Sequence, residues 1–264
     1  MNLDNLWAKV FREKDKPKQE IPPTSSKSPR EKYRSSPQES VLELRGFERT
    51  GKMLGGNIGN AQFVKIVDDG GGVFKPHTEC NPDEKRFFLS RERATYLVSR
   101  FLGFDFVPPT IIKIVDGKEG SLQEFVEDAQ VGYEVENEDV LVLGNEMSKL
   151  RIFDGLVDNS DRHGGNYLVK SGRIFAIDHG YTFNDIDSLK SRGMSVDDIP
   201  ADLADKLRSF ASSQEQQDIL KDLLRELLDG DIVGAFMKRV MSFVESIRPD
   251  NTFDHGKFDS LLRN

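Results

Sequence analysis

The sequence predicts an α+β fold in two lobes: a small lobe of antiparallel strands with one long helix, and a larger lobe that is mostly helical. Three observations predict it. Strand-like runs separated by glycine-rich turns extend from residue 41 to about residue 122. One long segment whose apolar residues recur at helical spacing interrupts these strands. Further segments with helical spacing dominate after Pro200. A β-rich stretch followed by a helical stretch is typical of α+β architecture.

Residues 1–40 are expected to precede the folded domain. Apolar side chains fall on one helical face within residues 3–16, which predicts a short amphipathic segment. This segment either packs back on the main domain or docks on a partner or a membrane surface. Residues 17–40 are rich in Pro, Ser and Lys and poor in aliphatic side chains, so they are expected to form a disordered linker.

The first lobe of the domain, which spans residues 41–264, is expected over about residues 41–122. Its long helix is predicted over residues 82–103 and ends at Gly103, a residue that suits a helix C-terminus. The second and third strands are expected to pair antiparallel through a turn rich in Asp and Gly. The expected strands, in order, are 41–54, 62–67, 72–76, 110–115 and 121–128.

Residues 123–128 are expected to form a hinge, and residues 129–264 the second lobe. Met147, Leu150 and Phe153 share one face of a helical stripe, and the later stripes of Leu and Phe are expected to be core. The expected helices are 146–159, 213–230 and 231–248, the last ending before Pro249, and two short strands are expected at 167–170 and 173–178.

The composition is that of a globular protein from a reducing compartment. Hydrophobic residues make up 37% of the 264 residues, which is enough for a sizeable core. No apolar run reaches the roughly 20 residues of a membrane span, and no secretory signal is visible. The single cysteine, Cys80, excludes an intramolecular disulfide. We therefore expect a cytoplasmic protein, with peripheral membrane contact as the alternative.

The charge of the chain argues against nucleic acid as its main partner. The sequence has 37 basic and 45 acidic side chains, which give a formal net charge of −8. A strongly basic surface is the usual electrostatic mark of nucleic-acid binding. No nucleic-acid partner is therefore expected.

A glycine-rich loop precedes the second expected strand. Gly55, Gly56 and Gly59 surround Asn57 within a few residues. Glycines at this spacing let backbone N–H groups approach a phosphate closely. The alternative is an ordinary glycine-rich hairpin turn.

Lys75 and Glu92 are candidates for a phosphate-binding pair. Lys75 has apolar neighbours on an expected central strand, where an unpaired lysine is rare. Its point charge suits a bound polyphosphate, and Glu92 on the following helix could pair with it, with Glu84 as the competitor. The alternative is a solvated lysine on an edge strand, which Pro76 supports.

Polar side chains crowd a loop between a helix and a strand. Asp161 could accept a proton from a hydroxyl nucleophile, and Asn166 offers an oxygen ligand that suits Mg²⁺. Asp178 follows an apolar strand, the place where a carboxylate could hold a cation that bridges phosphates. The alternative for both segments is a polar turn without a ligand.

Taken in order, these segments are the parts used in protein-kinase-type phosphoryl transfer. The loop reads D-R-H-x-x-N and the turn D-H-G, whereas H-R-D, D-F-G and A-P-E are absent. The chain resembles the phosphatidylinositol 3-/4-kinase catalytic-domain family over about residues 50–185, most closely the type II phosphatidylinositol 4-kinases and their small bacterial relatives. The segments that carry this resemblance are VFKP, SLQEFVEDA, NSDRHGGNYLV and FAIDHGYTF.

The resemblance implies a bilobal protein-kinase-like fold, with ATP and Mg²⁺ as cofactors. It implies that the glycine loop covers the phosphates, that Glu92 orients Lys75, and that backbone groups of the hinge meet adenine. The implied ATP-binding residues are Gly55, Gly56, Asn57, Gly59, Lys75, Glu92, Glu124 and Val126. The implied catalytic residues are Asp161, His163 and Lys75, and the implied metal ligands are Asn166 and Asp178.

The function expected from these features is transfer of the ATP γ-phosphoryl group to a hydroxyl acceptor, either a protein or a small molecule. In the family that the sequence resembles, the stretch after Asp178 recognises the substrate. In this chain the acidic residues of that stretch outnumber its two basic residues, Lys190 and Arg192. A phosphorylated inositol headgroup would favour a basic cluster there. Two alternatives remain: a phosphatidylinositol kinase acting at a membrane, and a nucleotide-binding pseudokinase, scaffold or nucleotidyl transferase.

Overall fold

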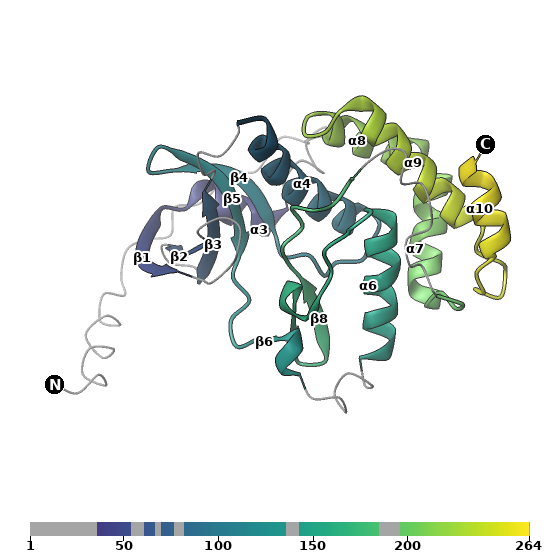
Figure 1. Cartoon of the computed structure of the whole chain (residues 1–264), viewed down its shortest axis with the longest axis horizontal. Helices are drawn as coiled ribbons and strands as arrows, with labels where there is room; N and C mark the ends of the chain where they lie inside the picture. Colours follow the sequence, from purple (N-terminus) through teal and green to yellow (C-terminus); the bar gives the residue numbers. More distant parts are fainter. Residues whose placement is uncertain are drawn as a thin grey trace, which may run out of the picture.

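The computed structural model describes residues 36–53, 61–66, 70–76, 82–135, 143–184 and 196–263. In Figure 1 the strands β1 to β5 gather on one side, the helices α6 to α10 lie on the other, and α4 lies between them. The two-lobed α+β architecture predicted from the sequence is confirmed. The amphipathic segment 3–16 and the glycine loop Gly55, Gly56, Asn57 and Gly59 lie outside the described residues.

A five-stranded antiparallel sheet forms the first lobe, with the strand order β1-β2-β3-β5-β4. Its strands are β1 (Phe47–Met53), β2 (Gln62–Ile66), β3 (Gly71–Pro76), β4 (Thr110–Val115) and β5 (Lys118–Glu124). The expected pairing of β2 with β3 is confirmed. Because β3 lies between β2 and β5, the strand that carries Lys75 is central, and the edge-strand alternative is wrong.

The core of this lobe is a small apolar cluster under the sheet. Gly120 on β5 lies opposite Pro76, and a Cβ there would come within 2.5 Å of the Lys75 carbonyl oxygen and the Phe74 ring. The close approach of β3 and β5 therefore requires glycine at this position. The members of the cluster are Leu42, Val64, Ile66, Phe74, Ile111, Val115 and Leu122.

Helix α4 (Pro82–Phe101) crosses between the lobes. Its stripe of Ala94, Leu97 and Val98 is fully buried and joins the larger core of the second lobe. The chain leaves the helix through Gly103, whose φ of +74° is the left-handed conformation that glycine adopts at a helix end. The expected helix and its end are confirmed.

Helix α3 (Pro37–Leu44) differs from the expectation of a linker up to residue 40 followed by a strand. Ser36 caps the helix: its hydroxyl accepts a hydrogen bond from the Glu39 N–H, and the Glu39 carboxylate accepts one from the Ser36 N–H. This reciprocal capping box, with Pro37 in the first turn, favours a helix over a strand. The ordered domain therefore begins before residue 41.

The second lobe begins with a small sheet beside helix α6 (Gly144–Leu156). Its strands run in the order β6-β7-β8 and are β6 (Gln130–Val131), β7 (Tyr167–Lys170) and β8 (Arg173–Ala176). A short 3₁₀ turn, η1 (Gly132–Glu134), follows β6, and a second, η2 (Gly164–Asn166), leads into β7. This arrangement places the loop from residue 157 to residue 166 directly before β7.

Four further helices complete the described part of the chain: α7 (Ala201–Ser212), α8 (Gln214–Arg225), α9 (Gly230–Glu245) and α10 (His255–Arg263). α8 and α9 were expected, whereas α7 and α10 were not. α7 buries Leu203, Leu207 and Phe210 in the core, and α10 buries Phe258. Within the described residues, no helix combines the length and apolarity that a membrane crossing requires.

Candidate active site

Three charged side chains, those of Lys75, Glu92 and Asp178, lie together between the two lobes. The Lys75 Nζ lies 2.6 Å from Glu92 Oε1 and 3.0 Å from Asp178 Oδ1. Glu92 belongs to α4, and Asp178 follows β8 in the second lobe. Lys75 therefore pairs with Glu92, the partner expected from the sequence. Its second contact, with Asp178, joins the two lobes.

The three side chains of this cluster differ in how far they are exposed to solvent. The Glu92 side chain is 7% exposed, that of Lys75 22% and that of Asp178 54%. Burial opposes the positive charge of Lys75, but Glu92 first and Asp178 second outweigh it, so the pKa of Lys75 lies above its ordinary value. Lys75 therefore remains a cation, which is held between a buried carboxylate and a half-exposed one.

Ser121 supports the ion pair from the neighbouring strand. It lies opposite Lys75 in the β3–β5 register, is buried, and donates a hydrogen bond of 3.0 Å to Glu92 Oε2. The two oxygens of Glu92 are thus occupied by Lys75 and Ser121, which fixes the carboxylate. The sequence did not single out Ser121; a polar residue opposite Lys75 becomes informative only when the strand register is known.

The loop between α6 and β7 holds Asp161 and Asn166 together. The Asn166 Nδ2 donates to the Asp161 carbonyl oxygen at 2.8 Å and lies 3.3 Å from Asp161 Oδ2. Asn159 Oδ1 accepts from the Asp161 N–H at 3.0 Å and shapes the turn before it. The side chain of Asn166 is buried, and its Oδ1 accepts no hydrogen bond within the described part of the chain.

Arg162 joins this loop to helix α6 and to the segment 177–179. Its Nε and NH2 lie 2.9 Å and 3.0 Å from the two carboxylate oxygens of Asp154 on α6. Its NH1 donates to the carbonyl oxygens of Asn166 and Ile177, and its NH2 lies 3.0 Å from His179 Nε2. A fork of fixed donors is suited to such a role. Sequence reasoning assigned no role to Arg162 or Asp154, because their contacts depend on the packing of α6.

Burial and the charges of Arg162 and Lys75 favour the neutral form of the His179 imidazole. This histidine is fully buried, and the pKa of its imidazole lies well below the ordinary value because of burial, then the charge of Arg162, then that of Lys75. A neutral His179 can accept the Arg162 N–H at Nε2, which fits the 3.0 Å contact. The residue after Asp178 is therefore anchored inside the second lobe.

His163 lies at the exposed side of the same loop. Its Nδ1 accepts a hydrogen bond of 3.0 Å from the Gly165 N–H. When the imidazole is neutral, its proton must then be on Nε2. The side chain consequently offers an N–H donor to a group bound in front of the loop.

Asp178 adopts an unusual backbone conformation. Its φ is +58°, in the left-handed region that non-glycine residues rarely occupy. Such strain is found at functional sites when the surrounding structure enforces it. Here the neighbouring residues enforce it, since the Ile177 N–H donates to the Asn166 carbonyl oxygen and His179 contacts Arg162.

Asn166 and Asp178 offer oxygen donors of the kind that a divalent cation of the magnesium type prefers. The amide nitrogen of Asn166 is turned toward Asp161, which leaves its oxygen as a ligand. Asp178 Oδ2 accepts no hydrogen bond from the residues that the structure describes, and its side chain is half exposed. Hard cations prefer such oxygen donors and usually keep several waters.

The hinge segment offers backbone groups to a ligand. The Phe125 N–H donates to the Gly71 carbonyl oxygen at 2.9 Å, and the Glu124 N–H donates to the Pro109 carbonyl oxygen at 2.9 Å. The Val126 N–H has no hydrogen-bond partner among the described residues. An adenine ring is bound through such backbone groups in the family that the sequence resembles.

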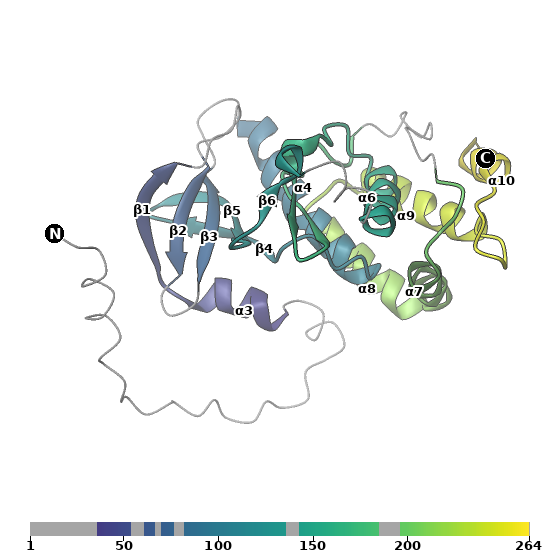
Figure 2. The ribbon, with the colours of Figure 1, turned by 90° about the horizontal axis from the view of Figure 1, so that it is seen from below.

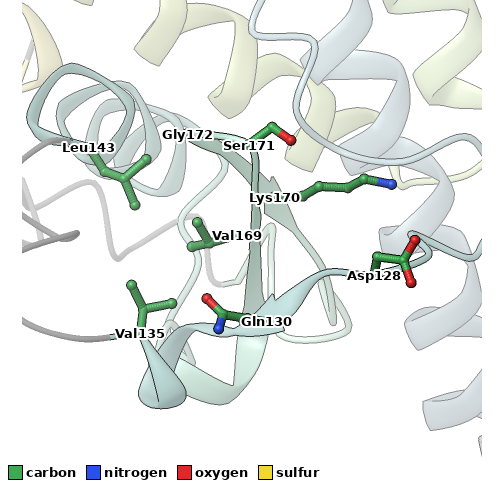
Figure 3. A pocket seen from close by; sticks show the side chains of 8 residues that line it. All are labelled: Asp128, Gln130, Val135, Leu143, Val169, Lys170, Ser171 and Gly172. Carbon is green, nitrogen blue, oxygen red and sulfur yellow. The ribbon is translucent and has the colours of Figure 1, made fainter.

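A separate hollow lies beside the small sheet of the second lobe. It has a volume of about 260 Å³, and none of the expected site residues lines it. Figure 3 shows Val135, Leu143 and Val169 on its apolar side and Lys170 and Asp128 at its rim. Residues 136–142, which join two of its lining residues, lie outside the described chain, so no role is assigned to this hollow.

Comparison with known proteins agrees with the second half of the site. Residues 113–229 match the family model for phosphatidylinositol 3- and 4-kinase. This segment contains the hinge, Asp161, Asn166 and Asp178, whereas Lys75 and Glu92 precede it.

Two individual proteins are also similar to this chain. Protein Rv2133c of Mycobacterium tuberculosis is 27% identical over 198 residues, which cover 59% of this chain and 68% of that protein. The crystal structure of the Helicobacter pylori proinflammatory kinase CtkA covers 74% of this chain and 95% of its own chain, with 16% identity and a TM-score of 0.44. The family match confirms the resemblance that the sequence motifs carry, and this chain is similar over residues 113–229 to the phosphatidylinositol 3-/4-kinase-like family.

Proposed function

We propose that this protein is an ATP- and Mg²⁺-dependent phosphotransferase that moves the γ-phosphoryl group of ATP to a hydroxyl acceptor. The family match supports a kinase-like phosphotransferase in general terms. The observation that carries the finer proposal is the contact of Lys75 with both Glu92 and Asp178. This contact supports the proposal, because a lysine of one lobe that could bind phosphate lies beside a carboxylate of the other lobe that could bind a metal ion.

Lys75 would contact the phosphates of ATP from the first lobe. Its charge is held in place by Glu92, which is in turn held by Ser121, so little reorganisation is needed when a phosphate binds. Glu124 and Val126 would bind adenine through their backbone groups. The glycine loop would cover the phosphates, as its residue types suggest.

Asp161 would accept the proton of the acceptor hydroxyl. As the new bond between the hydroxyl oxygen and the γ-phosphorus forms, the bond from that phosphorus to the β-phosphate oxygen breaks, and ADP leaves. The Asp161 N–H donates to Asn159 Oδ1, and Asn166 Nδ2 donates to the Asp161 carboxylate, so the backbone and the carboxylate of Asp161 are held in a defined place. His163 would donate its Nε2 proton as a hydrogen bond to developing negative charge.

Asn166 and Asp178 would hold the magnesium ion. When bound, the cation supplies charge neutralisation for the phosphate oxygens. The amide nitrogen of Asn166 is held by Asp161, which leaves its oxygen as a ligand, and Asp178 Oδ2 accepts no hydrogen bond from the residues that the structure describes. Asp178 would also exchange part of its contact with Lys75 for the cation.

Labelled ATP tests this proposal. The purified protein is incubated with Mg²⁺ and γ-labelled ATP, beside α-labelled ATP, with a generic protein, a polyol and phosphatidylinositol vesicles as acceptors. Asp178→Asn removes the negative charge of one proposed metal ligand at nearly constant shape, and Asp202→Asn makes the same change at an exposed ion pair on α7. We expect γ-label on an acceptor, its loss in Asp178→Asn and its retention in Asp202→Asn.

Other outcomes would point elsewhere. Label from the α position would show nucleotidyl transfer and would overturn the proposal. Full activity in Asp178→Asn would show that the site is wrongly assigned. Label on lipid alone would identify the acceptor as the membrane-bound alternative without changing the mechanism.

A further inference from the structure

Three successive residues of α4 make contacts in three directions. Arg91 donates to the Phe183 carbonyl oxygen and to Asn184 Oδ1, both at 3.0 Å, in the segment after Asp178. Glu92 binds Lys75. Successive helical residues are about 100° apart around the helix axis, so Arg93 points away from the contacts of Arg91 and Glu92. Helix α4 is therefore held by the segment after Asp178, by Lys75 on β3 and by the partner of Arg93.

Arg93 points to Glu39 on α3. Its NH1 lies 2.5 Å from Glu39 Oε1, and Arg100, two turns later on α4, pairs with Glu39 Oε2. The Tyr96 hydroxyl donates to the same carboxylate at 3.1 Å. The Glu39 side chain is fully buried, so one carboxylate of α3 binds three successive turns of the helix that carries Glu92.

Helix α3 is itself anchored on the sheet. Leu42 is buried in the apolar cluster of the first lobe. Lys113 on β4 donates to the carbonyl oxygens of Leu42, Glu43 and Arg45, at 2.8, 2.9 and 3.3 Å, at the C-terminal end of α3. Figure 2 shows α3 running below the strands of the sheet. Its position is therefore set by β4 independently of α4.

We propose that Glu39 is a positioning residue for the nucleotide site, which acts by holding α4 where Glu92 reaches Lys75. This inference rests on the proposed function. A buried ion pair adds little net stability over an apolar replacement, because both charges must be desolvated. What the Glu39 contacts supply is a fixed distance between α3 and α4, and α3 therefore controls the Lys75–Glu92 contact.

The matched variant is Glu39→Gln, which keeps the shape and removes the charge. We expect it to lower kcat/KM for ATP about tenfold, the usual effect of losing charge-assisted contacts. Tyr96→Phe removes one donor to Glu39 with little risk to folding, and we expect a smaller loss of about threefold, since it removes one hydrogen bond and leaves both arginine contacts of the carboxylate in place. Lys149→Ala, which breaks an exposed ion pair on α6, serves as the control.

A double-mutant cycle separates positioning from a general structural role. If Glu39 acts through Glu92, Glu39→Gln should change kcat/KM for ATP less than about twofold in a Glu92→Gln background, since the contact is already lost. An equal loss in both backgrounds, or no loss in either, would overturn the inference.

Hydrogen exchange gives a readout that does not need activity. We expect Glu39→Gln to speed the exchange of the α4 amides at least fivefold while leaving those of α6 unchanged, because local opening reflects local contacts. Unchanged exchange in α4 would contradict the inference. If the wild-type protein transfers no phosphoryl group while α4 loosens in Glu39→Gln, the proposed function fails and the coupling of α3 to α4 is supported.

Discussion

Replacement of Arg162 by methionine should destabilise the second lobe and impair the site together. The side chains of Arg162 and Asp154 are 14% and 12% exposed, so Arg162→Met leaves a largely buried carboxylate without its cation. Breaking such a pair from one side costs about 3–5 kcal/mol, and the residual exposure favours the lower end, about 3 kcal/mol. For a domain of this size that corresponds to a Tm lower by roughly 6–12 °C.

The activity should fall for a separate reason. Arg162 also binds the carbonyl oxygens of Asn166 and Ile177, which flank the two expected metal ligands. Loss of a residue that orients such ligands typically costs about 10–100-fold in activity. Thermal unfolding followed by circular dichroism, and transfer of γ-label at a temperature well below Tm, measure the two effects.

A double variant separates stability from activity. Asp154→Leu combined with Arg162→Met replaces the pair by apolar side chains, which should recover most of the lost stability. It does not restore donors to the two carbonyl oxygens, so activity should stay low. The reasoning is refuted if Arg162→Met shifts Tm by less than about 2 °C, a value expected of exposed pairs, or if the double variant regains wild-type activity.

Three further predictions concern the same structure. Ser121→Ala removes the hydroxyl that donates to Glu92. Loss of this hydrogen bond, worth about 1 kcal/mol, should lower kcat/KM for ATP about fivefold in steady-state assays. Unchanged kinetics would contradict the role of Ser121 in holding Glu92. Mg²⁺ and ATP at about 100 times Kd should raise Tm by roughly 5–11 °C, and EDTA or Asp178→Asn should remove the metal-dependent part; a shift insensitive to both would exclude Asp178 as a ligand. The hydrogen bond from Lys149 lowers the pKa of Asp202 below 3.8, so its contribution to stability is present above that pH and is lost as the pH falls. Because Asp202 is exposed, Lys149→Ala should lower Tm by less than about 2 °C at pH 7 and by a smaller amount at pH 3, and a larger shift at pH 3 than at pH 7 would contradict this sign.

Much of the site could be predicted from the sequence because its chemistry is local. The pattern around Lys75 predicted a buried strand, and a buried lysine needs a carboxylate partner, which Glu92 supplies. Asp161 and Asn166 are only five residues apart, so one loop brings them together. These predictions depended on short segments whose residue types restrict their surroundings.

The parts that were not predicted depend on distant packing. The capping box at Ser36 is visible in the sequence, but so short a helix is not stable alone, and the residues of β4 and α4 that hold α3 lie far along the chain. Ser121 gains its role from the strand register, and Arg162 from the packing of α6. Hydrophobic periodicity cannot indicate which polar side chains will face one another.

The strand order of the first lobe has a consequence for how the protein is made. Lys75 lies on β3, whose neighbour β5 follows α4 and β4 in the chain. During synthesis, β3 can pair with β2 early, but its other edge stays open until the ribosome has released residues up to Glu124. Such non-local pairing is slow to form compared with a hairpin. Lys75, Glu92 and Ser121 should therefore come together late in folding, and nascent chains that end before β5 should expose an open strand edge that can pair with another chain.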